Sequence, residues 1–339
     1  MRQHNPFART TSRWLLAAAI GITASSALAD YPDRRIDAVV PWGAGGSTDN
    51  MARSLTPFVE NILGTDIIIN NRPGGTGVIG TNVVRTRPAN GYSLLYGAEN
   101  AQLYPVLELA DFDYGDMYPI SIIAQGIVLI AAPASREWQD FGDLLEEVHA
   151  NPGQLRMGDA GSGGLPSTVL AMLNAVDEVD VRSVTFGGDG PAITAMMGNH
   201  LDFMPLALAS AQEQLRAGNL RALAVLSDEP VELLPDVPPI TDFLPDMANF
   251  LPWGPFWGTY VHKDTPEEIT SRLEAAYAEA IDHEDFQAFL TRNGATSLNL
   301  QGEEAQEFLQ RWQSVTAWAM EEAGTANVSP ESLGIPRPE

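Results

Sequence analysis

Residues 36–70 read IDAVVPWGAGGSTDNMARSLTPFVENILGTDIIIN, and this stretch decides the fold class. Its two ends, residues 36–40 and 66–70, are short runs of β-favouring residues, and residues 49–63 between them carry apolar side chains at helical spacing. The pattern predicts a strand, a helix and a second strand, the unit from which parallel sheets are built. A glycine-rich turn, residues 41–49, joins the first strand to the helix.

Strand-like and helix-like segments keep alternating along the chain, which predicts an α/β protein. The expected strands are residues 93–96, 120–124, 127–132, 181–185, 201–204 and 220–226, and the expected helices are residues 141–150, 266–281, 284–293 and 303–323. At 339 residues the chain is long enough for two domains. No low-complexity linker separates two halves, so we expect the chain to cross between the domains twice.

Acidic residues outnumber basic residues by 44 to 19, which gives a net charge of −25. Such a chain repels the phosphates of nucleic acids and of anionic lipid headgroups, so we expect no nucleic-acid partner. The lack of cysteine excludes disulfides, thiolate metal sites and a cysteine nucleophile. Lys263 is the single lysine, and so few lysines beside so many acids suggest a surface suited to high salt, which screens the repulsion.

The N-terminus has the pattern of a secretory signal peptide. Arg2, Arg9 and Arg13 precede the apolar run 14–22, and Ala27-Leu28-Ala29 then gives a cleavage site before Asp30. A membrane anchor needs about 20 apolar residues, so this run is too short to span a bilayer. We therefore expect residues 1–29 to direct export and to be removed.

Three glycine-rich turns follow strand-like runs and open into predicted helices. They are residues 41–49, 71–80 and 158–164. A helix N-terminus presents unpaired N–H groups and a positive dipole end, and glycine lets a ligand approach the backbone closely. In the first turn Ser47 and Thr48 add hydroxyl groups, and Asp49 is suited to cap its helix or to orient a water. Three such turns in one chain favour a site for an anion.

Two enzyme-like patterns have to be weighed against this interpretation. Residues 75–80 fit the dinucleotide pattern G-x-G-x-x-G, with Glu99 about 20 residues on, but Pro73 interrupts the tight turn that this motif needs. Residues 160–164 resemble a G-x-S-x-G nucleophile elbow with its first glycine missing, so a secreted serine hydrolase using Ser162 stays open as an alternative. No histidine stands in a recognisable catalytic or metal-binding pattern, so we predict no catalytic residue, no metal and no cofactor.

Two further regions bear on the second half of the predicted fold. Asp202 opens a strand-like run, and residues 186–191 precede a helix from about Ala192. These residues either face a ligand cleft or form a turn cap and a plain loop. The aromatic cluster of residues 253–260 is expected to be core at a domain crossover rather than a ligand cage; its members are Trp253, Phe256, Trp257 and Tyr260.

A succession of short motifs resembles the Bug/TctC family, the extracytoplasmic solute-binding proteins of tripartite tricarboxylate transporters. The resemblance covers essentially the whole chain after the signal peptide. The motifs are Val40-Pro41-Trp42, residues 45–49, residues 71–75, Asn90-Gly91-Tyr92, Gly188 with Pro191-Ala192, residues 220–225 and residues 234–238.

The resemblance implies a type II periplasmic-binding-protein fold, in which two α/β domains joined by two crossover strands close over a ligand cleft. Residues 30–125 with 254–339 would form the first domain, and residues 126–253 the second. The implied function is capture of a small carboxylate in the periplasm, either a di- or tricarboxylate or an aromatic acid. The protein would need no cofactor, act as a monomer and deliver the ligand to the large and small membrane subunits of a transporter.

The resemblance also implies a set of ligand-binding residues. They are Trp42, Gly46, Ser47, Thr48 and Asp49 from the first turn, Ala160, Gly161, Ser162 and Gly163 from the turn in the second domain, and Asp202 at the cleft edge. The sequence departs from the family pattern at Asp159, Gly164, Ser167 and Gly187, where the family often has serine, serine and histidine, and lysine. The expected pocket therefore has few fixed positive charges, and its substrate stays open, as does a role in sensing rather than transport.

Overall fold

The computed structural model describes Met1 and residues 31–338. The predicted signal peptide and its cleavage site before Asp30 therefore lie outside the described residues, apart from Met1. Among the helices that the structure describes, none is both long and apolar enough to cross a membrane.

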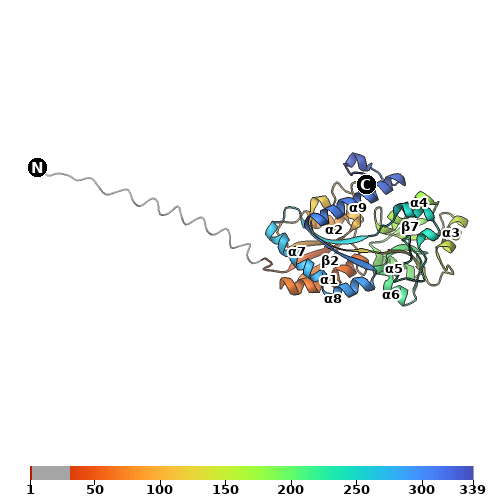
Figure 1. Ribbon diagram of the computed structural model, residues 1–339, viewed down its shortest axis with the longest axis horizontal. Coiled ribbons are helices and arrows are strands. Elements are labelled where there is room, and N and C mark those ends of the chain that lie inside the picture. The colour runs from red at the N-terminus through yellow and green to blue at the C-terminus, as the bar shows by residue number, and fades with distance from the viewer. Residues whose placement is uncertain (2–30, 339) are drawn as a thin grey trace.

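A six-stranded mixed sheet forms the larger part of the molecule, in the order β11-β4-β10-β3-β1-β2. The pairs β1–β2 and β1–β3 are parallel, whereas β10 runs antiparallel to β3 and β4, and β11 antiparallel to β4. Figure 1 shows α1 and α8 on one side of this part and α2 and α9 on the other. We call this part the first lobe; its elements are β1 (Ile36–Val40), α1 (Ser47–Leu63), β2 (Ile67–Asn71), α2 (Val78–Arg85), β3 (Ser93–Ala98), η1 (Glu99–Leu103), η2 (Tyr114–Asp116), β4 (Met117–Gly126), β10 (Phe256–His262), α7 (Glu267–Ile281), α8 (Glu284–Arg292), β11 (Ala295–Leu300), α9 (Gly302–Glu322) and η5 (Pro330–Leu333).

Two small sheets make up the second lobe. In one, β5 lies between β8 and β9 and is antiparallel to both, and in the other β6 pairs in parallel with β7. A single bridge between Met157 and Phe203 connects the two sheets. The elements of this lobe are β5 (Val128–Pro133), α3 (Phe141–Ala150), β6 (Arg156–Asp159), α4 (Leu165–Val176), β7 (Arg182–Thr185), α5 (Asp189–Met197), β8 (Met204–Ala207), α6 (Leu208–Arg216), β9 (Leu220–Val225), η3 (Ile240–Asp242) and η4 (Pro245–Phe250).

The chain passes between the lobes twice, as the sequence predicts. Strand β4 ends at Gly126 and β5 begins at Val128, so the first crossing is nearly continuous strand. The second crossing lies between β9 and β10, and α9 packs against it: Trp312 donates an indole hydrogen bond to the Gly254 carbonyl at 3.1 Å, and its ring lies 5.3 Å from that of Phe256. All four aromatic side chains at this crossing are buried, which confirms them as core.

The predicted unit β1–α1–β2 is present, with α1 beginning at Ser47 rather than Asp49. The expected strand at residues 201–204 is displaced: β8 runs from Met204 to Ala207. The displacement arises because residues 202 and 203 bend toward the other sheet, where the Asp202 and Phe203 amides donate hydrogen bonds to the Arg156 carbonyl. Strand β6 is the strand-like run expected before the third glycine turn, whereas strands β10 and β11 and helix α6 were not expected from the sequence.

Candidate ligand-binding site

A cavity lies where the two lobes meet, and both lobes line it. It holds about 410 Å³ of empty space, counted out to its opening to solvent. The lining residues are Trp42, Gly46, Ser47, Thr48, Ala98, Glu99, Ala160, Leu165, Pro166, Gly188, Asp189 and Pro255.

Three helices begin at this cavity: α1 at Ser47, α4 at Leu165 and α5 at Asp189. The residue before each helix is a glycine with no capping side chain, and at α1 the Asp189 carboxylate accepts a hydrogen bond from the Ser47 amide. Unpaired N–H groups and the partial positive charge of helix N-termini stabilise a bound anion. Three converging N-termini therefore give the cavity an anion-binding character without any basic side chain.

Asp49 does not line the cavity but holds the first glycine turn in shape. Its buried carboxylate accepts hydrogen bonds from the Gly45 amide (2.9 Å), from Asn71 Nδ2 (2.9 Å) and from Arg53 Nε (3.0 Å). Burial raises the pKa of Asp49, but these hydrogen bonds and the Arg53 charge outweigh burial, so the pKa is lowered overall. The carboxylate thus fixes the loop that presents Ser47 and Thr48 to the cavity.

The glycine turn of the second lobe contributes Ala160 to the cavity, whereas Gly161, Ser162 and Gly163 lie outside its lining. Gly161 has a φ of +96° and packs against the first lobe, where an added Cβ atom would lie 2.5 Å from Thr76 Oγ1. The turn therefore serves the contact between the lobes as well as the cavity.

Ser162 is exposed, and within the described part of the chain the histidine side chains make their hydrogen bonds with other residues. His283 accepts a hydrogen bond from the Asp285 amide at 3.2 Å as the N-cap of α8, and His149 lies 3.1 Å from Asp177. Neither histidine is placed to activate Ser162.

The lobes touch directly through glycine residues beside the cavity. The Gly43 amide donates a hydrogen bond to the Gly187 carbonyl at 2.6 Å, and a Cβ atom at Gly190 would lie 2.2 Å from the Ala44 carbonyl oxygen. Across the same contact, Ser47 Oγ donates to Asp189 Oδ2 at 3.3 Å. The structure is thus a closed form, and only glycine at position 190 permits so close an approach.

Two acids line the cavity, and neither is among the ligand-binding residues that the resemblance implies, although Asp189 lies within residues 186–191, which were expected either to face a cleft or to form a loop. Glu99 is 5% exposed, and burial, together with the nearby charge of Asp189, raises its pKa to about 8. Burial also raises the pKa of Asp189, although hydroxyl groups of Ser210 (2.8 Å) and Ser47 (3.3 Å) donate hydrogen bonds to it. Glu99 entered the sequence analysis only as a ribose-binding acid; its position directly after the buried strand β3 is the signal that points to a cavity.

The dinucleotide-like motif serves packing inside the first lobe. An added Cβ atom at Gly77 would lie 2.9 Å from the Tyr104 hydroxyl, and the Thr76 carbonyl accepts hydrogen bonds from Asn100 and Tyr104. None of residues 75–80 lines the cavity.

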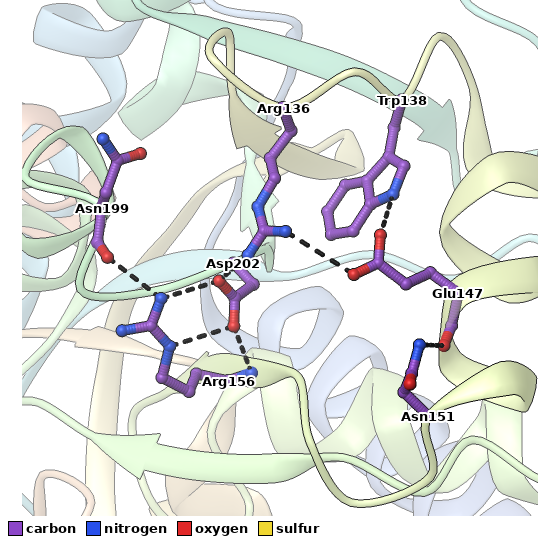
Figure 2. A network of polar contacts seen from close by, with 7 residues as sticks. All are labelled: Arg136, Trp138, Glu147, Asn151, Arg156, Asn199 and Asp202. Atoms are coloured by element: carbon purple, nitrogen blue, oxygen red, sulfur yellow. Dashed lines mark hydrogen bonds and ion pairs between the residues drawn. The ribbon is translucent and has the colours of Figure 1, made fainter.

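Asp202 lies in a polar network away from the cavity lining, and Figure 2 shows it between two arginines. Arg156 donates to it from the backbone amide (2.6 Å), Nε (3.0 Å) and Nη2 (2.8 Å), and Arg136 bonds it from the other side. Burial raises the pKa of Asp202, but the two guanidinium groups outweigh burial and lower it. Arg136 also lies 3.6 Å from Glu147, which accepts a hydrogen bond from Trp138 at 2.7 Å, so the network joins β6 and β8 to α3.

Two α/β lobes that close over an anion-favouring cavity define a solute-binding protein. Residues 51–320 match the family described as the tripartite tricarboxylate transporter family receptor, TctC. The chain belongs to this family, which confirms the resemblance of its motifs.

Relatives and solved structures agree with this membership. The chain is 30% identical over 280 residues to a UPF0065 protein from the tcbD–tcbE intergenic region of Pseudomonas sp. strain P51, covering 79% of this chain and 81% of that one. It is 27% identical over 321 residues to BugT of Bordetella pertussis, covering 89% and 94%. The periplasmic binding protein BugD matches with a TM-score of 0.81 and 26% identity over 87% of this chain and 99% of that one. MatC from Rhodopseudomonas palustris with bound malate matches with a TM-score of 0.77 and 27% identity over 86% and 100%. These comparisons give no support to a serine hydrolase.

Proposed function

We propose that this protein is the periplasmic receptor of a tripartite transporter and that it captures a small carboxylate in the cavity between its lobes. The observation that carries the proposal is the convergence of three helix N-termini on one cavity. The malate bound by MatC supports the ligand class, because MatC shares the fold and 27% of aligned residues. The protein binds and releases its ligand without a covalent step.

Ligand binding and closure are coupled through the groups at the contact between the lobes. An anion in the cavity can accept hydrogen bonds from the N–H groups of α1 and from those of α4 or α5. It receives all of these hydrogen bonds only in the closed form. The ligand therefore stabilises the closed form relative to the open one. In the closed form the contact of Gly43 with Gly187 and that of Ser47 with Asp189 are also made.

Delivery then requires the closed form to dock on the membrane. We propose that the large and small membrane subunits of the transporter are the partners, that the receptor acts as a monomer, and that residues 1–29 are cleaved before Asp30 on export. The two-domain division at residues 125–126 and 253–254 belongs to the same proposal.

The test is a thermal-shift panel on residues 30–339 with succinate, malate, adipate, citrate and benzoate. A ligand at 100 times its dissociation constant adds about 2.7 kcal/mol of stability, which is a measurable rise in Tm. Ser47→Ala should weaken binding about fivefold because it removes a hydroxyl from the cavity, whereas Ser54→Ala, on the same helix but outside the cavity lining, should not. A flat panel with folded, ligand-free protein would contradict the proposal.

A further inference from the structure

The cavity poses an electrostatic problem for a carboxylate ligand, and this inference rests on the proposed function. No arginine, lysine or histidine is among the residues that line it, and its two ionisable groups, Glu99 and Asp189, are both acids. If both acids were ionised, a carboxylate would meet two like charges in a site from which most water is excluded.

Glu99 is the acid that lacks a side-chain partner. It lies directly after β3, at the start of η1, and within the described part of the chain no side chain donates a hydrogen bond to its carboxyl group. Asp189 differs, because Ser210 and Ser47 both donate to it. Glu99 is 5% exposed and lines the cavity, so it faces the space in which the proposed function places the ligand.

The groups around Glu99 come from four elements, and none is a cation. Asp189 faces it from α5, and the phenol groups of Tyr104, Tyr114 and Tyr260 lie nearby, from the end of η1, from η2 and from β10. Tyr114 donates its hydroxyl hydrogen to the Ala98 carbonyl at 2.6 Å. Burial disfavours a charge on Glu99, and the charge of Asp189 acts in the same direction: the pKa of Glu99 is raised to about 8, so the group carries a proton at neutral pH.

We propose that Glu99 is a specificity-determining residue, whose protonated carboxyl group donates a hydrogen bond to a carboxylate oxygen of the ligand. One carboxylate of the ligand binds at the helix N-termini, and a second meets the Glu99 O–H. Such an O–H···O⁻ bond is short and strong, and it requires the neutral acid. The preferred ligand is therefore a dicarboxylate, and its binding is linked to the proton on Glu99.

The test is titration calorimetry of residues 30–339 with succinate, malate, adipate and citrate, followed for the tightest of these at about pH 6.5 and about pH 9. For a group with a pKa of about 8, roughly a tenth remains protonated at pH 9, so wild-type affinity should fall about tenfold. Near pH 8.5, titrations in buffers of different ionisation enthalpy should show uptake of most of one proton per ligand bound.

Substitutions of Glu99 distinguish a neutral hydrogen-bond donor from a negatively charged carboxylate at this position. Glu99→Gln keeps a neutral donor, so it should bind within about threefold of wild type near pH 6.5 and lose both the pH dependence and the proton uptake. Glu99→Ala should bind more weakly at both pH values. Glu146→Gln, the same change at an exposed site on α3, should behave as wild type throughout.

Three outcomes overturn the proposal. One is a wild-type affinity that does not change between these pH values. Another is a loss of binding in Glu99→Gln together with a wild-type preference for aspartate over succinate, which would make Glu99 an anion that pairs with a ligand ammonium group. The third is that no carboxylate binds the folded protein at any pH, which overturns the proposed function as well; the first two leave that function standing.

Discussion

Two pairs of acids in this protein have opposite surroundings. Asp49 and Asp202 each accept hydrogen bonds from arginine, and their pKa values are lowered. Glu99 and Asp189 line the cavity without any arginine, and their pKa values are raised. The same type of side chain thus stabilises the scaffold in one place and remains open to a ligand in the other.

The comparison of these two pairs shows which acids stabilise the fold and which lower its stability at the cavity. An ionised acid with a charged partner can stabilise a fold, whereas a buried acid without one favours its neutral form and destabilises the folded state above its ordinary pKa. Residues that break the rules of a stable interior are concentrated at functional sites. By this criterion Glu99 belongs to the site, and Asp202 belongs to the scaffold.

The largest loss of stability is expected from Asp202→Ala, because this variant leaves Arg136 and Arg156 without their shared carboxylate. Because Asp202 is buried and the arginines are about a third exposed, we expect a loss of about 2 to 4 kcal/mol in the free energy of unfolding. Urea denaturation at neutral pH measures it. A loss below about 0.5 kcal/mol would mean that this network does not hold the second lobe together.

Glu99→Gln is expected to raise the free energy of unfolding rather than lower it. The ordinary pKa of Glu99 is 4.5 and its folded value is about 8, so its cost to stability is absent below pH 4.5 and grows as pH rises from there to 8. The variant should therefore be more stable than wild type by about 2 kcal/mol near pH 6 and equal to it near pH 4. Thermal unfolding across this pH range checks the sign, and a variant less stable near pH 8 would place Glu99 in the scaffold group.

A smaller effect is expected from Asp49→Asn, which keeps the shape of the side chain and removes its charge. The Arg53 side chain is half-exposed, so we expect a loss of about 1 kcal/mol in stability at neutral pH. Ligand binding should weaken only a few-fold, because Asp49 acts on the ligand only through the turn. Since the folded pKa of Asp49 is lowered, this contribution is present above its unfolded pKa near 4 and is lost as pH falls below it. Denaturation at about pH 7 and about pH 3 should therefore show the difference from wild type only at the higher pH.

The sequence predicts the parts of the fold that local pattern controls. The unit β1–α1–β2 combines two β-branched runs with a periodic helix, and each glycine turn does open into a helix. Strand β11 was not predicted because its sequence, ATSLNL, lies at the edge of the sheet and is only partly buried. It therefore shows no clear alternation of apolar and polar residues. In the candidate site, glycine and hydroxyl patterns predicted the turns and the family resemblance implied the individual residues, of which Trp42, Gly46, Ser47, Thr48 and Ala160 line the cavity.

The acids could not be sorted from the sequence, because their partners are distant in the chain. Asp202 meets Arg136 and Arg156, which are 66 and 46 residues away, and Asp189 meets Ser47 across 142 residues. These contacts depend on how the two lobes fold and close. A local pattern therefore predicted turns that line the cavity but not the acids opposite them.

Binding by this protein depends on closure of the lobes over the ligand, and Gly190→Ala is designed to prevent that closure. Alanine suits helix α5, but its Cβ atom would lie 2.2 Å from the Ala44 carbonyl oxygen and hold the lobes apart. Titration calorimetry with the carboxylate that gives the largest thermal shift should show binding weakened about 100-fold or more, with the Tm of the ligand-free protein nearly unchanged. Wild-type affinity in this folded variant would contradict binding by closure of the two lobes.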